Sequence, residues 1–463
     1  MATSARGKAR EGVRGAPLAR WTAAAVLSVA AACSSYRPRP LQTDMEWARL
    51  ESVRLGDLVA PRGPAEALGD MPAFDYSDGL SPDEAAAVAV ALNPELRAFR
   101  AGRGVAEGQL IEAGLLPNPE LDGRWTNLSG AIAGELSVLF DLSEALATRG
   151  PRTERARARI EEVRWEVADR EWQLANDVRA AWIALAYAGE ALALLRSQGA
   201  VAGRTVDILR ARREAGSATE LDIVVAESER AEVTRQERRL AGNQRLALER
   251  LNALLGLPPA HETRIGGGGI GYTALDEAER GDAGQLRIRR PDLQAAEKAY
   301  LVAENELHVA YRRRWGNIGL GPSTDSAGGS VDWGVALSWV IPVFHLNQGE
   351  IDVRAAERHQ RREAYVALLH RARAELQETW SERVAINDEL AVLFSEVAPH
   401  LDRSIELAEA AFRGGELDLL QVLLLQSRAL DRKRETLERL RDFQLAGVAH
   451  KRALGPPQPD TGS

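Results

Sequence analysis

Two spacings of apolar residues follow each other along the first part of the chain. Between Ser81 and Gly114, apolar residues recur three and four positions apart, and the segment starts with Ser-Pro-Asp-Glu. Both the spacing and the start predict a helix. Pro117, Asn118 and Pro119 end that spacing. Beyond them apolar and polar residues alternate, the spacing typical of strands. The Pro-Asn-Pro sequence therefore predicts a junction at which a helix hands over to strands.

The longest helical pattern covers residues 153–215, a stretch without proline. About 60 residues at about 1.5 Å each reach about 90 Å, far more than an ordinary globular core requires. Residues 351–412 repeat the feature with Pro399 interrupting it, and the equivalent part of the first stretch carries Gly199 and Gly203. We therefore expect both long helices to break or kink near one level.

The order of elements occurs twice. Asn-Pro-Glu-Leu at 93–96 corresponds to Arg-Pro-Asp-Leu at 290–293, and each opens a helix that leads into strand-like sequence. Gly216 aligns with Gly415, 199 positions further on. The first copy ends in Gly-Leu-Pro-Pro at Gly256 and the second in Gly-Pro-Pro at Gly455, which is the same offset. Such an offset is far longer than a solenoid repeat, so it indicates one domain-sized unit that has been duplicated.

The strictest alternation lies in residues 331–343, where every odd position is apolar. Twelve steps span about 41 Å, or about 29 Å at a tilt of about 45°, enough for the apolar band of an outer-membrane barrel. Residues 132–142 repeat the pattern. The positions expected to face lipid are Trp333, Val335, Leu337 and Trp339.

The number of strands decides between two interpretations. One such strand alone fits a buried sandwich strand better than a membrane strand. Two strands in each repeat make four in the chain, whereas the smallest membrane barrels have about eight. A barrel therefore requires several copies of the chain.

Composition agrees with a chain built largely of long helices. Of 463 residues, 45% are hydrophobic and 27% charged, as in folded proteins, yet 5% are aromatic and Ala, Arg, Glu and Leu dominate. The formal net charge of −8 becomes −12 without residues 1–32, which carry five basic residues and one acidic residue. This acidic balance argues against nucleic acid as the main partner.

The N-terminal residues 1–32 have the features of a cleaved export signal, a basic start followed by a short apolar stretch at 21–32. Cys33 follows directly and is the only cysteine, so it cannot form an internal disulfide. Its placement resembles a bacterial lipobox, which implies a lipidated Cys33 and, with Ser34 beside it, delivery to the outer membrane; the alternative is a stray thiol. After Cys33 we find no run of about 18 apolar residues, so any membrane crossing is expected to be β.

Residues 79–121 resemble the opening of the TolC-like outer-membrane efflux proteins, whose hallmark is an Asn-Pro-Glu-Leu helix start followed by Leu-Leu-Pro-Asn-Pro. The paired stretches 216–227 and 415–426 are similar too, and the matching segments keep their order from about residue 80 to residue 457. The resemblance implies a mainly α-helical fold with a small membrane β part. A long α-helical coiled-coil tunnel would continue into a β-barrel completed by trimerisation, with four strands per chain. Pro117 to Pro119 would lie where the wall enters lipid, whereas the second junction lacks Pro-Asn-Pro and relies on glycine.

The same resemblance implies a function. Such a protein is the lipid-anchored outer-membrane exit duct of a tripartite efflux system in a Gram-negative bacterium, a homotrimer joined to a periplasmic adaptor protein and an inner-membrane pump. It is a passive conduit for small molecules or metal ions, from the periplasm to the outside.

The resemblance also implies residues at the periplasmic end of the tunnel. The tips at Gly216 and Gly415 would meet the adaptor, and acids about two turns beyond would ring a constriction. Asp222 keeps an acid at that position, Gln421 does not, and Asp418 lies nearer the tip. A solvated surface carboxylate is an equally good interpretation of Asp222.

The expected organisation has six parts. They are a signal peptide (1–32), a lipidated N-terminal extension (33–79), a first repeat (80–258), a linker (259–284), a second repeat (285–457) and a C-terminal tail (458–463).

An enzyme is the obvious rival class, and the sequence offers little for it. The glycines at 266–269 lack the Gly-Lys-Ser/Thr that follows in phosphate-binding loops, and the seven His lack the spacing of metal ligands. We therefore expect no catalytic residue, cofactor or metal. A periplasmic coiled-coil structural or adaptor protein without a barrel is the alternative, because helical spacing fits both, and the long alternation of 331–343 discriminates against it.

Overall fold

The computed structural model describes residues 36–53, 55, 78–128, 131–266, 269–327, 330–414 and 416–457. The chain forms two compact units, Met1–Ser52 and Val53–Ser463. The described part of the first unit contains helix α2 (Thr43–Glu51), in which no residue is buried. The expected signal peptide, Cys33 and Gly415 lie outside the described residues.

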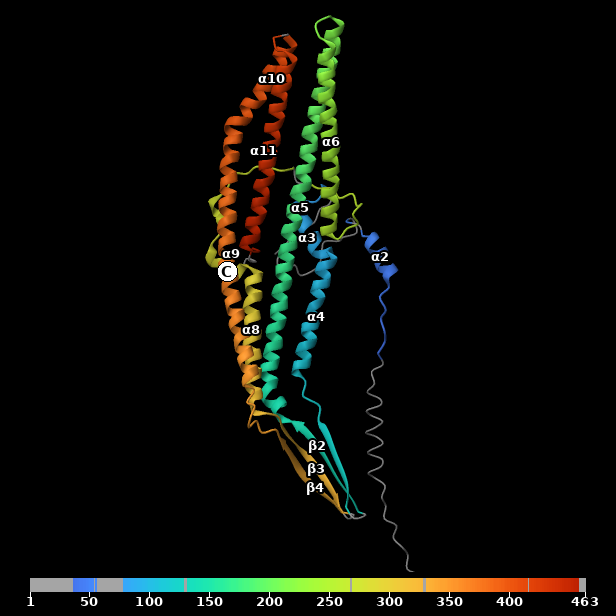
Figure 1. Ribbon diagram of the computed structural model, residues 1–463, viewed down its shortest axis with the longest axis vertical. Coiled ribbons are helices and arrows are strands. Elements are labelled where there is room, and N and C mark those ends of the chain that lie inside the picture. The colour runs from blue at the N-terminus through green and yellow to red at the C-terminus, as the bar shows by residue number, and fades with distance from the viewer. Residues whose placement is uncertain are drawn as a thin grey trace, which may run out of the picture. The chain divides into compact units, whose positions relative to one another are not determined.

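The second unit contains the order helix, two strands, long helix, helix twice along the chain (Figure 1). The four strands lie together at one end of this unit, and the tips between α5 and α6 and between α10 and α11 lie at the other. The elements of the first repeat are α3 (Pro82–Leu92), α4 (Pro94–Gly114), β1 (Glu120–Leu128), β2 (Ala131–Asp141), α5 (Arg149–Glu214) and α6 (Glu220–Leu255). Those of the second are α7 (Leu286–Arg289), α8 (Pro291–Arg312), β3 (Ile318–Ala327), β4 (Ser330–Trp339), α9 (Gln348–Val392), α10 (Ala398–Gly414) and α11 (Leu419–Leu454).

The helical stretch before Pro117 is divided into two helices. It begins as expected at Ser81, whose side chain accepts the Glu84 backbone N–H at 3.3 Å while the Glu84 carboxylate accepts the Ser81 N–H at 2.9 Å. The division falls at Asn93, because Pro94 disfavours the helical conformation of the residue before it. The Asn93 side chain then caps α4 by accepting the Leu96 N–H at 3.0 Å.

Equivalent residues close the two repeats in the same way. The Asn93 side-chain amide donates to the Leu254 carbonyl at 2.9 Å, near the end of α6. In the second repeat the Arg290 guanidinium donates to the Ala453 carbonyl at 3.3 Å, near the end of α11. The last helix of each repeat is thus tied to the start of the same repeat, which supports the proposed duplication.

A glycine follows the last helix of each repeat, and it allows the two ends of that repeat to approach closely. Gly256 and Gly455 have φ angles of 74° and 82°, in the left-handed region that favours glycine. A Cβ at Gly256 would lie 2.9 Å from the Leu92 carbonyl oxygen, and one at Gly455 would lie 2.9 Å from that of Arg289. Any other residue would therefore push the two ends of a repeat apart.

The long helices differ from the expected pair of breaks. In the second repeat a π-helical segment, Leu393–Val397, separates α9 from α10 directly before Pro399. In the first repeat α5 continues through Gly199 and Gly203 without interruption, so the helix does not break there as one form of the prediction had it. Glycine keeps the backbone N–H that the helix needs, whereas proline removes it.

The main core lies where α3 packs against α5 and α6. It includes Leu80, Val88, Val178, Trp182 and Leu255, all almost fully buried. One helical stretch, Ser143–Glu214, is long and apolar enough to cross a membrane by length and composition, which the sequence pattern had not led us to expect. Of the apolar segment of this helix, 56% is buried inside the protein, as in a core helix.

The four strands form one antiparallel sheet in the order β1-β2-β3-β4. The central pairing joins the two repeats, with Phe140 of β2 opposite Leu320 of β3. β1 and β4 have free outer edges within the described chain. The expected strand 331–343 ends earlier, at Trp339, which lies opposite Ile318, the first residue of the neighbouring strand β3. Its ten residues span about 31 Å, or about 22 Å at a tilt of about 45°.

Candidate functional site

One face of the sheet is largely apolar across all four strands, apart from Asn127, Thr324 and Ser326. Directly opposite residues of an antiparallel pair share a face. The register therefore brings together Leu121 and Trp125 of β1, Leu136, Val138 and Phe140 of β2, Ile318, Leu320 and Pro322 of β3, and Val331, Trp333, Val335, Leu337 and Trp339 of β4. Trp333, Val335 and Leu337 are exposed to 80%, 74% and 68%. A soluble monomer rarely leaves so extended an apolar surface open, so this face is made for an apolar environment or a partner.

Two glycines on the apolar face are covered by a tryptophan. A Cβ at Gly134 would lie 3.0 Å from the ring of Trp125, its partner across the ladder, and one at Gly123 would also meet this ring. The indole therefore lies flat along the sheet over positions that carry no side chain. This fills gaps in the apolar face of β1 and β2.

The charged residues of the four strands all lie on the opposite face of the sheet, and all of them except Arg124 are acidic. One row across the four strands consists of Arg124, Glu135, Asp325 and Asp332, each opposite the next. Glu120, Asp122 and Asp141 share this face. The two faces thus differ sharply, as the alternation in the sequence predicts.

The junctions between helix and strand use different residues in the two repeats. Pro117, Asn118 and Pro119 lie between the end of α4 at Gly114 and the start of β1 at Glu120. In the second repeat Gly316 follows a short 3-10 turn with a φ of 72°, and a Cβ there would clash with the Val340 carbonyl. The second junction therefore requires glycine, as its sequence suggested.

Both hairpin tips are fixed by reciprocal helix caps. Gly216 lies between α5 and α6 with a φ of 74°. At the start of α6 the Asp222 carboxylate accepts the Thr219 backbone N–H at 2.8 Å and its hydroxyl at 2.7 Å. At the start of α11 the Asp418 carboxylate accepts the Gln421 N–H at 2.8 Å, and the Gln421 side chain accepts the Asp418 N–H at 3.3 Å.

These caps give Asp222 a structural task that the sequence-based account omitted. Asp222 and Gln421 are equivalent positions, and each is the third residue of its helix and closes the cap. The hydrogen bonds from the Thr219 backbone and side chain lower the pKa of Asp222, so its charge persists in mildly acidic solution. A capping box reads Ser/Thr-x-x-Glu/Gln, and its variant Thr-x-x-Asp here could have been found from the sequence.

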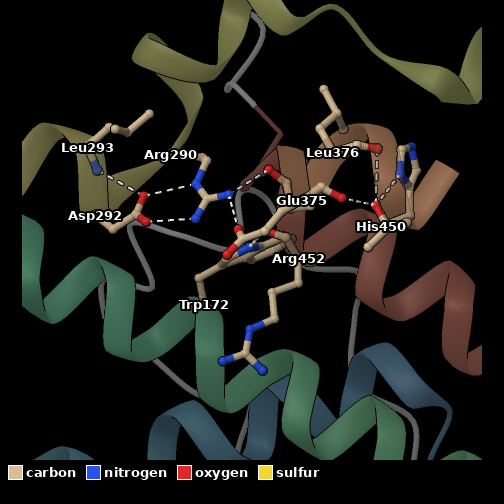
Figure 2. A network of polar contacts seen from close by, with 10 residues as sticks. Trp172, Arg290, Asp292, Leu293, Glu375, Leu376, His450 and Arg452 are labelled. Atoms are coloured by element: carbon tan, nitrogen blue, oxygen red, sulfur yellow. Dashed lines mark hydrogen bonds and ion pairs between the residues drawn. The ribbon is translucent and has the colours of Figure 1, made fainter. Parts of the chain in front are cut away.

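The sequence did not reveal a partly buried polar network where the two repeats meet. Figure 2 shows Arg290, at the start of the second repeat, held between Asp292 and Glu375. Its guanidinium donates to Asp292 at 2.7 and 3.0 Å and to Glu375 at 2.8 Å. The Trp172 indole of α5 donates to the Arg452 carbonyl at 3.2 Å, which ties the first repeat to the last helix of the second. Glu375 lies 85 residues from Arg290, and Arg452 lies 280 residues from Trp172, so sequence spacing carries no signal for these contacts.

Two titratable groups belong to this joint. Burial, and secondly the negative charge of Asp292, raise the pKa of Asp169 to about 6, against the opposing effect of Arg290. Burial lowers the pKa of His450, whose ring lies between the Thr379 hydroxyl at 3.1 Å and the Glu279 carbonyl at 3.1 Å. A hollow of about 440 Å³ opens beside Asp169 and Arg290.

The described residues contain no group of three or more His, Cys, Asp or Glu that could hold a metal ion. A scan against models of protein families and a search of curated proteins find no match for the sequence.

Three solved structures with this fold are outer-membrane proteins. The CmeC outer membrane channel of Campylobacter jejuni has a TM-score of 0.70 at 14% identity, over 86% of this chain and 96% of that one. The outer membrane protein VceC of Vibrio cholerae has a TM-score of 0.66 at 17% identity, over 81% and 96%. The open state of the MtrE outer membrane channel of Neisseria gonorrhoeae has a TM-score of 0.64 at 17% identity, over 85% and 100%. At such identities the likeness establishes the fold, which confirms the expected class of long helices with a small sheet of four strands.

Proposed function

We propose that this chain, which has the fold of the TolC-like outer-membrane channels, is the outer-membrane exit duct of a tripartite efflux system. It is a passive conduit from the periplasm to the outside for small molecules or metal ions. The conduit catalyses no reaction, and it discriminates by width and charge rather than by a fitted pocket.

The observation that carries the proposal is the sheet. Its four strands have an apolar face, a polar face and two free edges, at β1 and β4. In lipid a free edge leaves backbone groups without partners, so only a closed barrel is stable there. Four strands are too few for closure, and three chains would supply twelve, with β4 of one chain beside β1 of the next.

The helical end supports the proposed partners. The hairpin tips lie at the end of the second unit opposite the strands (Figure 1). Leu221, Val224 and Leu424, close to the tips, have exposed side chains. We propose that this end meets a periplasmic adaptor protein, which connects the duct to an inner-membrane pump that supplies the energy. Asp222 would contribute to the constriction near the tips.

The anchor completes the proposal. Cys33 would carry acyl chains such as palmitate and hold the N-terminus at the inner surface of the outer membrane. On a barrel protein such an anchor would add a second attachment to the membrane.

The alternative is a periplasmic coiled-coil structural or adaptor protein. The helices suit both functions, whereas the sheet favours the duct, because a water-soluble adaptor gains nothing from a row of exposed Trp, Val and Leu on β4.

Fractionation of cells that express the full chain tests the proposal. The duct should be in the outer-membrane fraction as a trimer that resists detergent until heated, and it should conduct ions in planar bilayers. A periplasmic monomer without conductance would contradict the duct and favour the adaptor.

A further inference from the structure

Three consecutive arginines lie where α8 hands over to β3 (Figure 1). Arg312 ends α8, and Arg313 and Arg314 belong to the short 3-10 turn that follows it, Arg313–Trp315. Arg312 and Arg313 are exposed, while Arg314 is half-buried with its guanidinium 5.7 Å from the centre of the Trp315 ring. Trp315 is itself 65% exposed. The turn therefore presents positive charge and an indole ring together.

The connection between β4 and α9 lies against this turn. The Val340 N–H donates to the Asn317 carbonyl at 3.0 Å, and the Asn347 side-chain amide donates to the Ala310 carbonyl at 2.9 Å. Four apolar side chains of the connection are largely exposed, namely Val340, Ile341, Val343 and Phe344. Together with residues 312–315 they form a surface that we call the junction patch. It combines a basic part with an apolar part.

The junction patch continues the apolar face of the sheet. Trp339 belongs to that face, and its indole N–H donates to the Trp315 carbonyl at 3.3 Å. Trp339 is the last residue of β4 and lies opposite Ile318, the first residue of β3. The patch thus begins where the apolar face ends. At the edge of a lipid-facing surface, this level corresponds to the headgroups of the bilayer.

The acids near the patch already have partners within the chain. Two acids near the end of α8 form ion pairs with arginines of α9, Glu304 with Arg358 at 3.1 Å and Glu306 with Arg354 at 3.3 Å. Asp141, on the polar face of the sheet, accepts the Ser143 hydroxyl at 2.6 Å. Among the residues that the structure describes, none forms an ion pair with Arg313 or Arg314. Their charge is therefore available to a partner outside the chain.

The equivalent junction of the first repeat is built differently. The segment 115–119 between α4 and β1 contains no basic residue. Arg149 of α5 donates to the Gly114 carbonyl at 2.8 Å, and Arg152 forms an ion pair with Glu144. These two arginines hold the first junction together, whereas the arginines of the second junction have no such structural task.

We infer that the junction patch binds the headgroup of an anionic phospholipid, of the phosphatidylglycerol or cardiolipin class. The inference rests on the proposed function in one respect, namely that the sheet lies in the outer membrane with its helices in the periplasm. The patch then lies at the periplasmic surface of that membrane, where phospholipid headgroups are present. Arginine binds phosphate oxygens with directed, charge-assisted hydrogen bonds.

The apolar part of the patch selects a lipid over a free phosphate. Trp315 and Phe344 offer an amphipathic ring and an apolar ring beside the arginines, which suits the glycerol region and the first acyl carbons of a lipid. A free phosphate ion would gain nothing from these rings. Positive charge without an acid also favours a lipid of net negative charge over a zwitterionic one.

Native mass spectrometry of the purified full-length protein in detergent tests the inference. The protein is titrated with phosphatidylglycerol or with phosphatidylcholine of the same acyl chains, and the spectra report the bound lipids and their affinity. The parent should prefer phosphatidylglycerol. Combined Arg313→Gln and Arg314→Gln should weaken phosphatidylglycerol binding by about fivefold for each arginine, and leave phosphatidylcholine binding unchanged.

Matched variants separate the patch from charge in general. Combined Arg403→Gln and Arg432→Gln removes two exposed arginines from α10 and α11, far from the sheet, and should leave the lipid preference unchanged. Combined Arg313→Lys and Arg314→Lys keeps the charge and should retain most of the preference. Trp315→Ala should weaken the binding of both lipids.

Three results would overturn the inference. The first is equal affinity of the parent for the two lipids, and the second is an unchanged preference after both glutamine substitutions. The third is displacement of phosphatidylglycerol by inorganic phosphate at the same concentration and constant ionic strength, because the patch would then be a site for free phosphate.

Conductance in planar bilayers separates this inference from the proposed function. If the parent conducts but shows no lipid preference, the junction patch is refuted and the duct stands. If the parent prefers phosphatidylglycerol but does not conduct, the duct is contradicted and the patch remains a binding surface for anionic lipid.

Discussion

Leu337 of β4 lies directly opposite Leu320 of β3, and the next residue, Ser338, lies opposite Gly319. Adjacent residues of β4 therefore belong to different faces of the sheet, one apolar and one polar. Because side chains alternate with a period of two, this register fixes the face of every other residue in the strand.

Replacing Leu337 by Arg should impair assembly in the membrane. A charge near the middle of the lipid face of a strand costs about 2 to 4 kcal/mol, and it would recur in every chain of the ring. The yield of detergent-resistant trimer in the outer membrane should fall. Ser338→Arg is the matched control, because its side chain would face the polar interior. Equal loss of trimer in both variants would show that the proposed faces are wrong.

At the first tip, charge and helix capping can be separated. Asp222→Asn keeps an oxygen that can accept the Thr219 N–H but removes the charge, whereas Thr219→Ala weakens the cap and keeps the charge. If Asp222 contributes to the constriction, Asp222→Asn should weaken cation selectivity and block by multivalent cations in bilayer recordings, most clearly at low salt. Thr219→Ala should cost about 1 kcal/mol of local stability and leave selectivity unchanged.

Asp418→Asn is the second control for this prediction. Asp418 caps the other tip and lies nearer to its end, so loss of its charge should change selectivity less. Unchanged selectivity in Asp222→Asn would mean that this carboxylate is a helix cap and nothing more.

Much of this architecture follows from sequence spacing, and particular residues show where spacing stops being informative. The two faces of β4 could be predicted because a period of two depends on the strand alone. The cap at Asp222 could have been predicted from Thr219, three residues before it. The early end of β4 could not, because it depends on where the partner strand β3 begins. The network of Arg290 could not, because Glu375 and Ala453 reach it through tertiary packing. The continuity of α5 through Gly199 could have been expected, because glycine keeps the backbone N–H that a helix requires.

The joint between the repeats should respond to pH through Asp169. Its pKa in the folded chain, about 6, lies above the ordinary 3.8, so the folded state binds this proton more tightly than the unfolded state. The contribution of Asp169 to stability is therefore full below about pH 4 and is lost as the pH rises to about 6, by an amount of the order of 3 kcal/mol.

Asp169→Asn should remove this dependence, because asparagine resembles the protonated acid. The variant should be more stable than the parent at pH 8 and equal to it at pH 4, as measured by urea unfolding of the purified protein. Asp177→Asn is the control, since Asp177 forms a half-exposed ion pair with Arg452 at 3.1 Å and should change stability by less than about 1 kcal/mol. Equal stability of Asp169→Asn and the parent at pH 8 would contradict the assigned burial.

The anchor prediction concerns Cys33. Mass spectrometry of the mature N-terminus should find a chain that begins at Cys33 and carries acyl chains, each buried CH₂ of which stabilises membrane attachment by about 0.8 kcal/mol. Cys33→Ser should abolish the modification and leave the sheet able to assemble. An unmodified Cys33, or cleavage elsewhere, would refute the lipid anchor without affecting the account of the sheet.

Native mass spectrometry of the full-length protein, extracted from the outer membrane in detergent, tests most directly whether partner chains complete the sheet. Four strands with free edges at β1 and β4 predict an assembly of three times the mass of the mature chain, which Leu337→Arg should diminish and Ser338→Arg should not. A stable monomer in the same extract would contradict the account, because it would leave both edges and the apolar face without a partner.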